Sequence, residues 1–166
     1  TNGVVSKAEE QVASAGFALK FKNIGLIQYD IKAFRQQDTY NGLKHEARSR
    51  WQKNGFVADI QASFLSSDGE REESEFFRPK GDISKTFKKL NNLRIGVYAE
   101  REKNSRFIPE TDSLNSNSFY YDLLKFYIKS DESKSFGLGA NYSQRYDFAP
   151  SIDKFQQSTY ATDINV

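Results

Sequence analysis

Apolar and polar residues alternate with a period of two from Gly16 almost to the end of the chain, and this pattern constrains the fold most strongly. Successive side chains of a β-strand point to opposite faces, so sustained alternation predicts strands that are apolar on one face and polar on the other. The clearest alternating segments are 17–21, 27–33, 43–51, 56–64, 93–99 and 136–142. The pattern therefore predicts an all-β protein.

Turn signals divide the alternating segments into hairpins. Asn54-Gly55 supplies the positive φ angles of a tight two-residue turn, and Asn91-Asn92 marks a second turn. Polar stretches at 66–75 and 104–118 predict longer loops. We expect about nine strands, most of them about 10–14 residues long, whereas globular strands average about five or six residues. This predicts an antiparallel meander of long amphipathic strands, either a β-barrel or part of a larger barrel.

We expect one domain. Residues 1–15 are predicted to be a leader or a short helix, and residues 16–166 a single antiparallel β domain. The last alternating stretch ends in Asp163-Ile164-Asn165-Val166, with no polar tail or closing turn. We therefore expect the β domain to be truncated at its C-terminus.

Composition excludes several classes of function. The 24 basic and 22 acidic residues are interspersed, a balance that argues against a nucleic-acid partner. The chain has no cysteine, so it has neither a thiol nucleophile nor a disulfide framework. Its 14 Phe, 9 Tyr and 1 Trp argue against disorder. These aromatic residues suit the interfacial girdles of a membrane barrel, the core of a soluble β-protein, or stacking on sugars.

The candidate chemical sites each have a simpler structural interpretation. His45, the one histidine, has no second histidine or cysteine to complete a metal site or triad. The acidic run at 70–75 and Asp112 fall in predicted loops, where solvated charge is the expected role. Gly137 and Gly139 fall inside a predicted strand. The glycines of a phosphate-binding loop must instead follow a strand and open a helix. We predict no catalytic residue, no cofactor-binding residue and no metal site, and hence no enzyme.

Three hypotheses fit these features. The first is a transmembrane barrel wall, the second a soluble up-and-down barrel or sandwich that binds an apolar ligand or a glycan, and the third an enzyme on a β-scaffold. The second predicts that a set of large apolar residues points inward: Phe17, Ile31, Trp51, Ile60, Ile95, Leu124 and Leu138. Ala47, Ser49 and Lys85 are unfavourable for the first, because they would face lipid. The period of two fits either orientation of the apolar face.

Several stretches carry a resemblance to a known group of proteins: 64–66, 81–87, 112–114, 117–119 and 142–147. In these, and loosely from Gly16 onward, the chain resembles the barrel regions of large outer-membrane proteins of Bacteroidetes, including those of secretion and gliding machinery. The resemblance implies a bacterial outer-membrane location and a non-catalytic structural, transport or secretion role. It also implies a lipid bilayer and other envelope proteins as partners.

Overall fold

The fold is a single antiparallel sheet of ten strands in a computed structural model that describes residues 10–22, 24–36, 40–69, 72–108, 110–111, 113–114, 117–130, 139–149 and 156–165. The strands are β1 (Glu10–Phe21), β2 (Gly25–Gln36), β3 (Tyr40–Lys53), β4 (Phe56–Gly69), β5 (Glu73–Phe87), β6 (Leu93–Ile108), β7 (Ser113–Leu114), β8 (Phe119–Lys129), β9 (Gly139–Phe148) and β10 (Gln156–Asn165). The prediction of an all-β meander with about nine long strands is confirmed. The described residues contain no helix long and apolar enough to cross a membrane.

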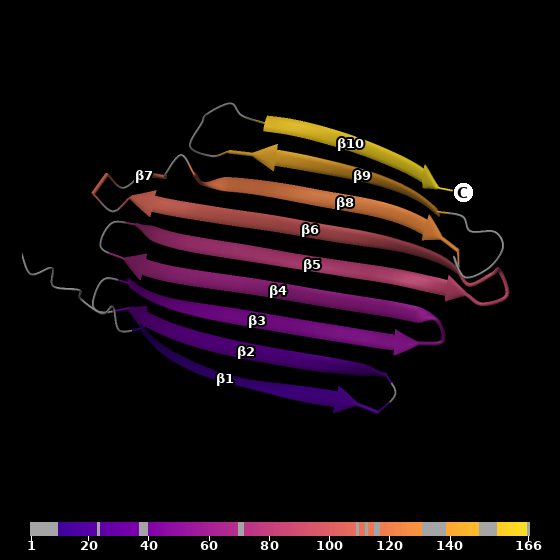
Figure 1. Cartoon of the computed structure of the whole chain (residues 1–166), viewed down its shortest axis with the longest axis horizontal. Coiled ribbons are helices and arrows are strands. Elements are labelled where there is room, and N and C mark those ends of the chain that lie inside the picture. The colour runs from indigo at the N-terminus through magenta and orange to yellow at the C-terminus, as the bar shows by residue number, and fades with distance from the viewer. Residues whose placement is uncertain are drawn as a thin grey trace, which may run out of the picture.

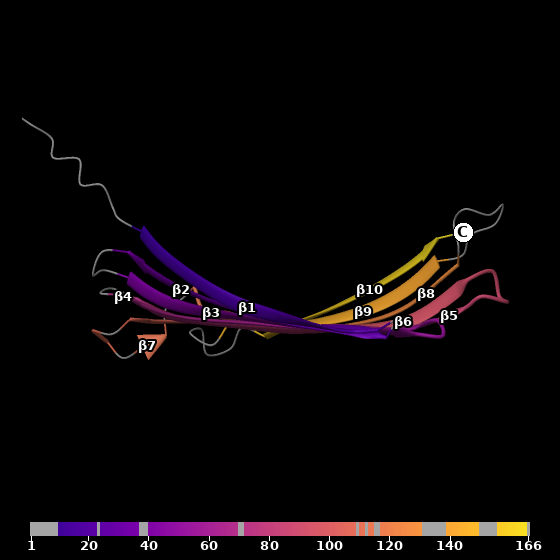
Figure 2. The ribbon, with the colours of Figure 1, turned by 90° about the horizontal axis from the view of Figure 1, so that it is seen from below.

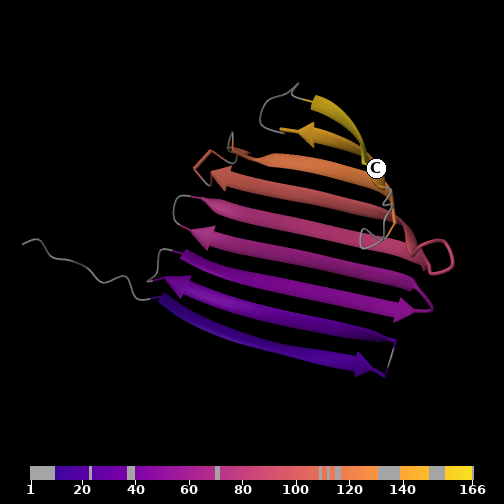
Figure 3. The same ribbon diagram turned by 45° about the vertical axis from the view of Figure 1, so that its right-hand side comes forward.

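The order of the strands in the sheet follows the order of the chain, except that the two-residue β7 pairs only with β6. β1 and β10 form the two edges, and the sheet is not closed by pairing between them (Figures 1 and 3). The connections are hairpins, because each long strand turns back directly onto the one before it. The predicted meander is thus an open sheet over the described residues.

Four strands are longer than the sequence pattern predicted. β1 begins at Glu10, so residues 10–15 belong to a strand rather than to a leader or short helix, while residues 1–9 lie outside the described residues. β4 and β5 also extend into the predicted loop 66–75, where the Ser67 and Ser74 hydroxyls lie 2.6 Å apart. Likewise β6 continues to Ile108. Serines and charged residues suggested loops, but here they belong to paired strands, with Ser67 and Ser74 on the polar face.

The predicted turn at Asn54-Gly55 is present. Both residues have positive φ, 49° and 78°, which suits the right-handed twist of the flanking strands β3 and β4. The second predicted turn also has positive φ at Asn91 and Asn92. Gly55 is further constrained because an added Cβ would lie 2.6 Å from the Thr86 carbonyl oxygen on β5.

We expect Gly55→Ala to destabilise the fold by about 1 kcal/mol, since an alanine at positive φ is strained. The crowding against Thr86 adds to this cost. The measurement is the urea midpoint of unfolding, compared with that of Asn54→Gly, which keeps the turn geometry. Equal midpoints for wild type and Gly55→Ala would contradict this account of the turn.

From β1 to β6, successive turns at one end of the sheet are displaced by a constant step. The β1–β2 hairpin closes at the pair Phe21–Gly25, which is in register with Trp51 on β3, yet the β3–β4 hairpin closes two residues further along, at Lys53–Phe56. Phe56 is in register with Lys85, and the β5–β6 hairpin again closes two residues further, at Phe87–Leu93. The displacement is visible along the right side of Figure 1. The ends of β1 to β6 therefore follow a line oblique to the strands, whereas the last β8–β9 pair at this end, Lys129–Gly139, is in register with Arg94 and does not continue it.

The sheet is curved as well as twisted, and the start of β1 and the end of β10 rise to the same side of the central strands (Figure 2). Burial differs between its faces. Along β6, Gly96, Glu100 and Glu102 are buried, whereas Val97 and Ala99 between them are exposed. Side chains converge on the concave side of a curved sheet, so this alternation places the face of Glu100 on the concave side.

Candidate functional site

The two faces of the sheet differ sharply in chemistry, and their burial is the reverse of that in a soluble globular domain. The apolar face is defined by large side chains that are exposed by 37–54%: Phe17, Leu19, Ile60, Ile83, Ile95, Val97, Leu124 and Phe126. The concave polar face carries three networks of charged and hydroxyl groups. We take these networks as the candidate site, because buried charges require specific partners.

The first network centres on Glu100 of β6, whose side chain is 6% exposed. Its carboxylate accepts hydrogen bonds from the hydroxyls of Tyr98 at 2.6 Å and Tyr121 at 2.8 Å, and it pairs with the Arg78 guanidinium. Arg78 Nε also lies 3.4 Å from the carboxylate of Glu102, which is 10% exposed. One arginine from β5 thus neutralises two neighbouring buried carboxylates of β6.

The same network extends to β9 through an aromatic contact. The Arg145 guanidinium carbon lies 4.2 Å from the centroid of the Tyr121 ring, close enough for a cation–π interaction. Arg145 also donates to Asp147 at 2.7 Å from Nη2 and at 2.9 Å from Nε. Tyr121 therefore connects the Glu100 cluster on β6 to the ion pair on β9.

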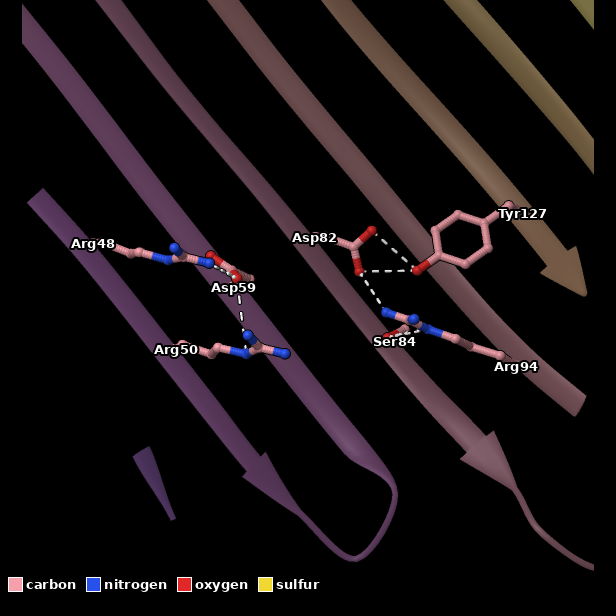
Figure 4. A network of polar contacts seen from close by, with 7 residues as sticks. All are labelled: Arg48, Arg50, Asp59, Asp82, Ser84, Arg94 and Tyr127. Atoms are coloured by element: carbon pink, nitrogen blue, oxygen red, sulfur yellow. Dashed lines mark hydrogen bonds and ion pairs between the residues drawn. The ribbon is translucent and has the colours of Figure 1, made fainter. Parts of the chain in front are cut away.

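The second network lies closer to the turn end of the sheet (Figure 4). Asp82 of β5 accepts hydrogen bonds from the Tyr127 hydroxyl at 2.9 and 3.0 Å, and its Oδ1 lies 3.4 Å from Arg94 Nη2. Arg94 Nε donates to the Ser84 hydroxyl at 3.0 Å. The Tyr127 ring reaches Asp82 across β6 at Gly96, where an added Cβ would collide with the ring.

The third network joins β3 to β4 and is shown beside the second in Figure 4. Asp59 accepts a hydrogen bond from Arg48 at 2.7 Å and lies 3.9 Å from Arg50 Nε. Gln61 donates to the other Asp59 oxygen at 3.1 Å. Two cations therefore face one carboxylate here, the reverse of the ratio around Arg78.

The networks bind the strands laterally through their side chains. Each of Asp59, Asp82, Glu100 and Asp147 pairs with an arginine. Catalysis by paired carboxylates needs one proton donor and one free base or nucleophile facing across a cleft. Here each of these carboxylates instead accepts hydrogen bonds or ion pairs from neighbouring side chains. The arrangement is suited to holding a charged, rigid and wettable surface.

The residues singled out from the sequence lie elsewhere. His45 is on the apolar face, where its Nδ1 lies 2.6 Å from the Tyr29 hydroxyl and its ring lies near Phe64, a packing role. In the acidic run, Glu72 pairs with Arg106 at 3.4 Å, while residues 70 and 71 and Asp112 lie outside the described residues. Gly139 begins β9, and Gly137 also lies outside them. No group of metal-ligating residues occurs in the part of the chain that the structure describes.

The sequence analysis did not identify the networks, although their residues were visible as the polar positions of the alternating pattern. Arg78 and Glu100 are 22 positions apart, and only the pairing of β5 with β6 brings them together. Alternation assigns residues to a face but does not give the register between strands. Comparison of the chain with protein families, with curated proteins and with solved structures finds no match.

Proposed function

We propose that this sheet is a wall segment of an outer-membrane β-barrel, with the apolar face toward lipid and the polar face toward the interior. The role is structural, or serves transport or secretion. The observation that carries this proposal is the pairing of an exposed apolar face with a concave face held by buried ion pairs. Membrane barrels have this arrangement, because their outer surface meets hydrocarbon and their interior is polar.

The polar atoms on the apolar face have partners that suit this setting. The Ser49 hydroxyl accepts a hydrogen bond from the Trp51 indole at 2.6 Å. Lys85 extends toward the turn, where its ammonium donates to the Asn54 carbonyl at 2.7 Å. Long cationic side chains near a membrane boundary place their charge at the polar interface in this way. Ser49 and Lys85, two of the three residues that were unfavourable for a lipid-facing surface, therefore have hydrogen-bond partners in this setting.

The oblique line of strand ends fits a tilted barrel strand. A displacement of two residues for every two strands corresponds to about 6.6 Å along the strand and about 9.6 Å across it, a tilt of about 35°. The apolar band slopes in the same direction. On β2, the last apolar residue of this face before the charged end of the sheet is Ala33. On β6 it is Ala99, which is in register with Ile27 of β2 and therefore lies nearer to the turns than Ala33 does. Barrel strands tilt by about 35–45° in membranes.

The soluble alternative requires the opposite curvature. A barrel or sandwich around an apolar ligand needs Phe17, Ile60 and Leu124 inside, and these side chains are 54%, 49% and 38% exposed. Of the other residues expected inside, Ile31, Trp51 and Ile95 lie on the same apolar face, and Leu138 lies outside the described residues. The concave side carries the ion pairs instead, which favours the membrane wall.

Trp51 offers a direct test, because it is the one tryptophan and lies on the apolar face stacked against Phe21. We expect its emission to shift to the blue in phosphatidylcholine vesicles and to be quenched by lipids brominated on their acyl chains. The control is Trp51→Phe combined with Leu123→Trp, which moves the reporter to the polar face. Its emission should respond to aqueous iodide more than to brominated lipid.

A compact monomer in detergent-free buffer, with Trp51 emission that is unchanged by vesicles, would argue decisively against a membrane wall. Size-exclusion chromatography with light scattering measures the first property. That result would favour the soluble ligand-binding barrel, in which the apolar face is covered by protein.

A further inference from the structure

We propose that the apolar face holds one anionic phospholipid, seated across β4, β5, β6 and β8; the proposal rests on the membrane-wall function. The seat is a depression of about 650 Å³. Its floor consists of the small residues Pro79, Gly81 and Ala99, and its apolar walls include Ile60, Ile83 and Leu124. Known ligand pockets span a similar range of about 300–1,000 Å³.

The floor is open because Gly81 has no side chain. A Cβ added there would have its nearest neighbour, Ile60 Cγ1, at 3.8 Å, which is an ordinary van der Waals contact. On the same strand, Ile83 is 47% exposed and stands beside the gap. A lipid-facing surface with such a gap leaves its lining atoms without contacts unless a chain fills it. An acyl chain lying along β5 supplies those contacts.

The depression ends in a cluster of charged and aromatic residues. A second hollow of about 440 Å³ adjoins it and shares Arg101, Asp122 and Tyr146 with it. Arg101 forms an exposed bidentate pair with Asp122, whose Nη2–Oδ2 distance is 2.8 Å. The Lys103 ammonium lies over the Tyr120 ring, 5.6 Å from its centroid.

This cluster stands where the apolar band ends on β6, just beyond Ala99. Tyrosine and lysine at that level are typical of the membrane–water interface. Arg101 is already neutralised by Asp122, so Lys103 is the cation that a phosphate would engage. The geometry thus places an acyl chain over Gly81 and the lipid phosphate at Lys103, a combination that free phosphate or a neutral diacylglycerol does not satisfy.

The test is native mass spectrometry of the full chain in detergent, titrated with phosphatidylglycerol and with diacylglycerol of the same acyl chains. We expect one phosphatidylglycerol per chain to saturate, and diacylglycerol to bind at least about tenfold more weakly, as expected for one lost charge-assisted hydrogen bond. Lys103→Gln should lose this preference, and Lys103→Arg should retain it. Gly81→Leu fills the depression and should weaken both lipids.

Lys88→Gln removes a cation from the turn after β5 and serves as the matched control. Saturable binding that survives both Lys103→Gln and Gly81→Leu would overturn the seat, as would equal binding of the two lipids. If the chain enters vesicles by the Trp51 assay yet retains no lipid, the seat fails and the wall function stands. A chain that is monomeric without detergent overturns both.

Discussion

Ile83→Arg is expected to destabilise the chain folded in phosphatidylcholine vesicles by about 2–4 kcal/mol, the cost of an arginine facing lipid near the bilayer midplane. Ile83 lies between Phe77 and Phe87 on β5, and its side chain is 47% exposed on the apolar face. In water, an exposed position of this kind tolerates the same change within about 0.5 kcal/mol. The free energy of unfolding, measured by urea titration of Trp51 fluorescence, distinguishes the two environments.

The matched control is Leu90→Arg, which places the same residue in the turn between β5 and β6. Leu90 is 60% exposed, and the turn lies beyond the end of the strands. At that level, an arginine costs about 0–1 kcal/mol. Equal effects of the two substitutions would show that Ile83 does not face hydrocarbon.

Gly96→Ala is the second substitution with a large expected effect, about 2–3 kcal/mol from overpacking and weakened hydrogen bonds. The added methyl group would collide with the Tyr127 ring, which crosses β6 at this glycine. Moving the ring separates its hydroxyl from Asp82, and Asp82 also pairs with Arg94. The same urea titration measures the loss.

Gly81→Ala provides the comparison on the opposite face, since Gly81 also lies in the interior of a strand but has open space above it. There, alanine should be neutral or stabilise the fold by up to about 1 kcal/mol by restricting the unfolded chain. A Gly96→Ala protein as stable as Gly81→Ala would mean that Tyr127 finds another position without loss. The second network would then be dispensable for stability.

The fold was accessible from the sequence because its dominant signal is local. Alternation fixes which residues share a face, and Asn54-Gly55 fixes one turn, so the all-β meander followed from short windows of sequence. Ser67 and Ser74 were misassigned to a loop because their environment depends on another strand and not on local sequence. Their polarity is typical of loops, and only the pairing of β4 with β5 brings their hydroxyls into contact and buries Ser67.

The candidate site was less accessible, because it depends on register across several strands. Tyr127 and Asp82 are 45 positions apart and meet across β6, a relation that no local pattern encodes. The direction of curvature was also hidden, since an alternating strand is equally compatible with a concave polar or a concave apolar face. Burial of Glu100 and Glu102 beside the exposed Val97 resolved which face is packed.

Because each long strand pairs with its neighbours along the chain, the sheet behaves as a one-dimensional array. A nearest-neighbour system can fray from its ends while its centre persists, as in repeat proteins. β1 and β10 each depend on a single neighbour, whereas β5 and β6 lie inside the array and share the densest ion pairing. Amide protons should therefore exchange in a gradient, fastest at the two edges and slowest around Arg78 and Glu100.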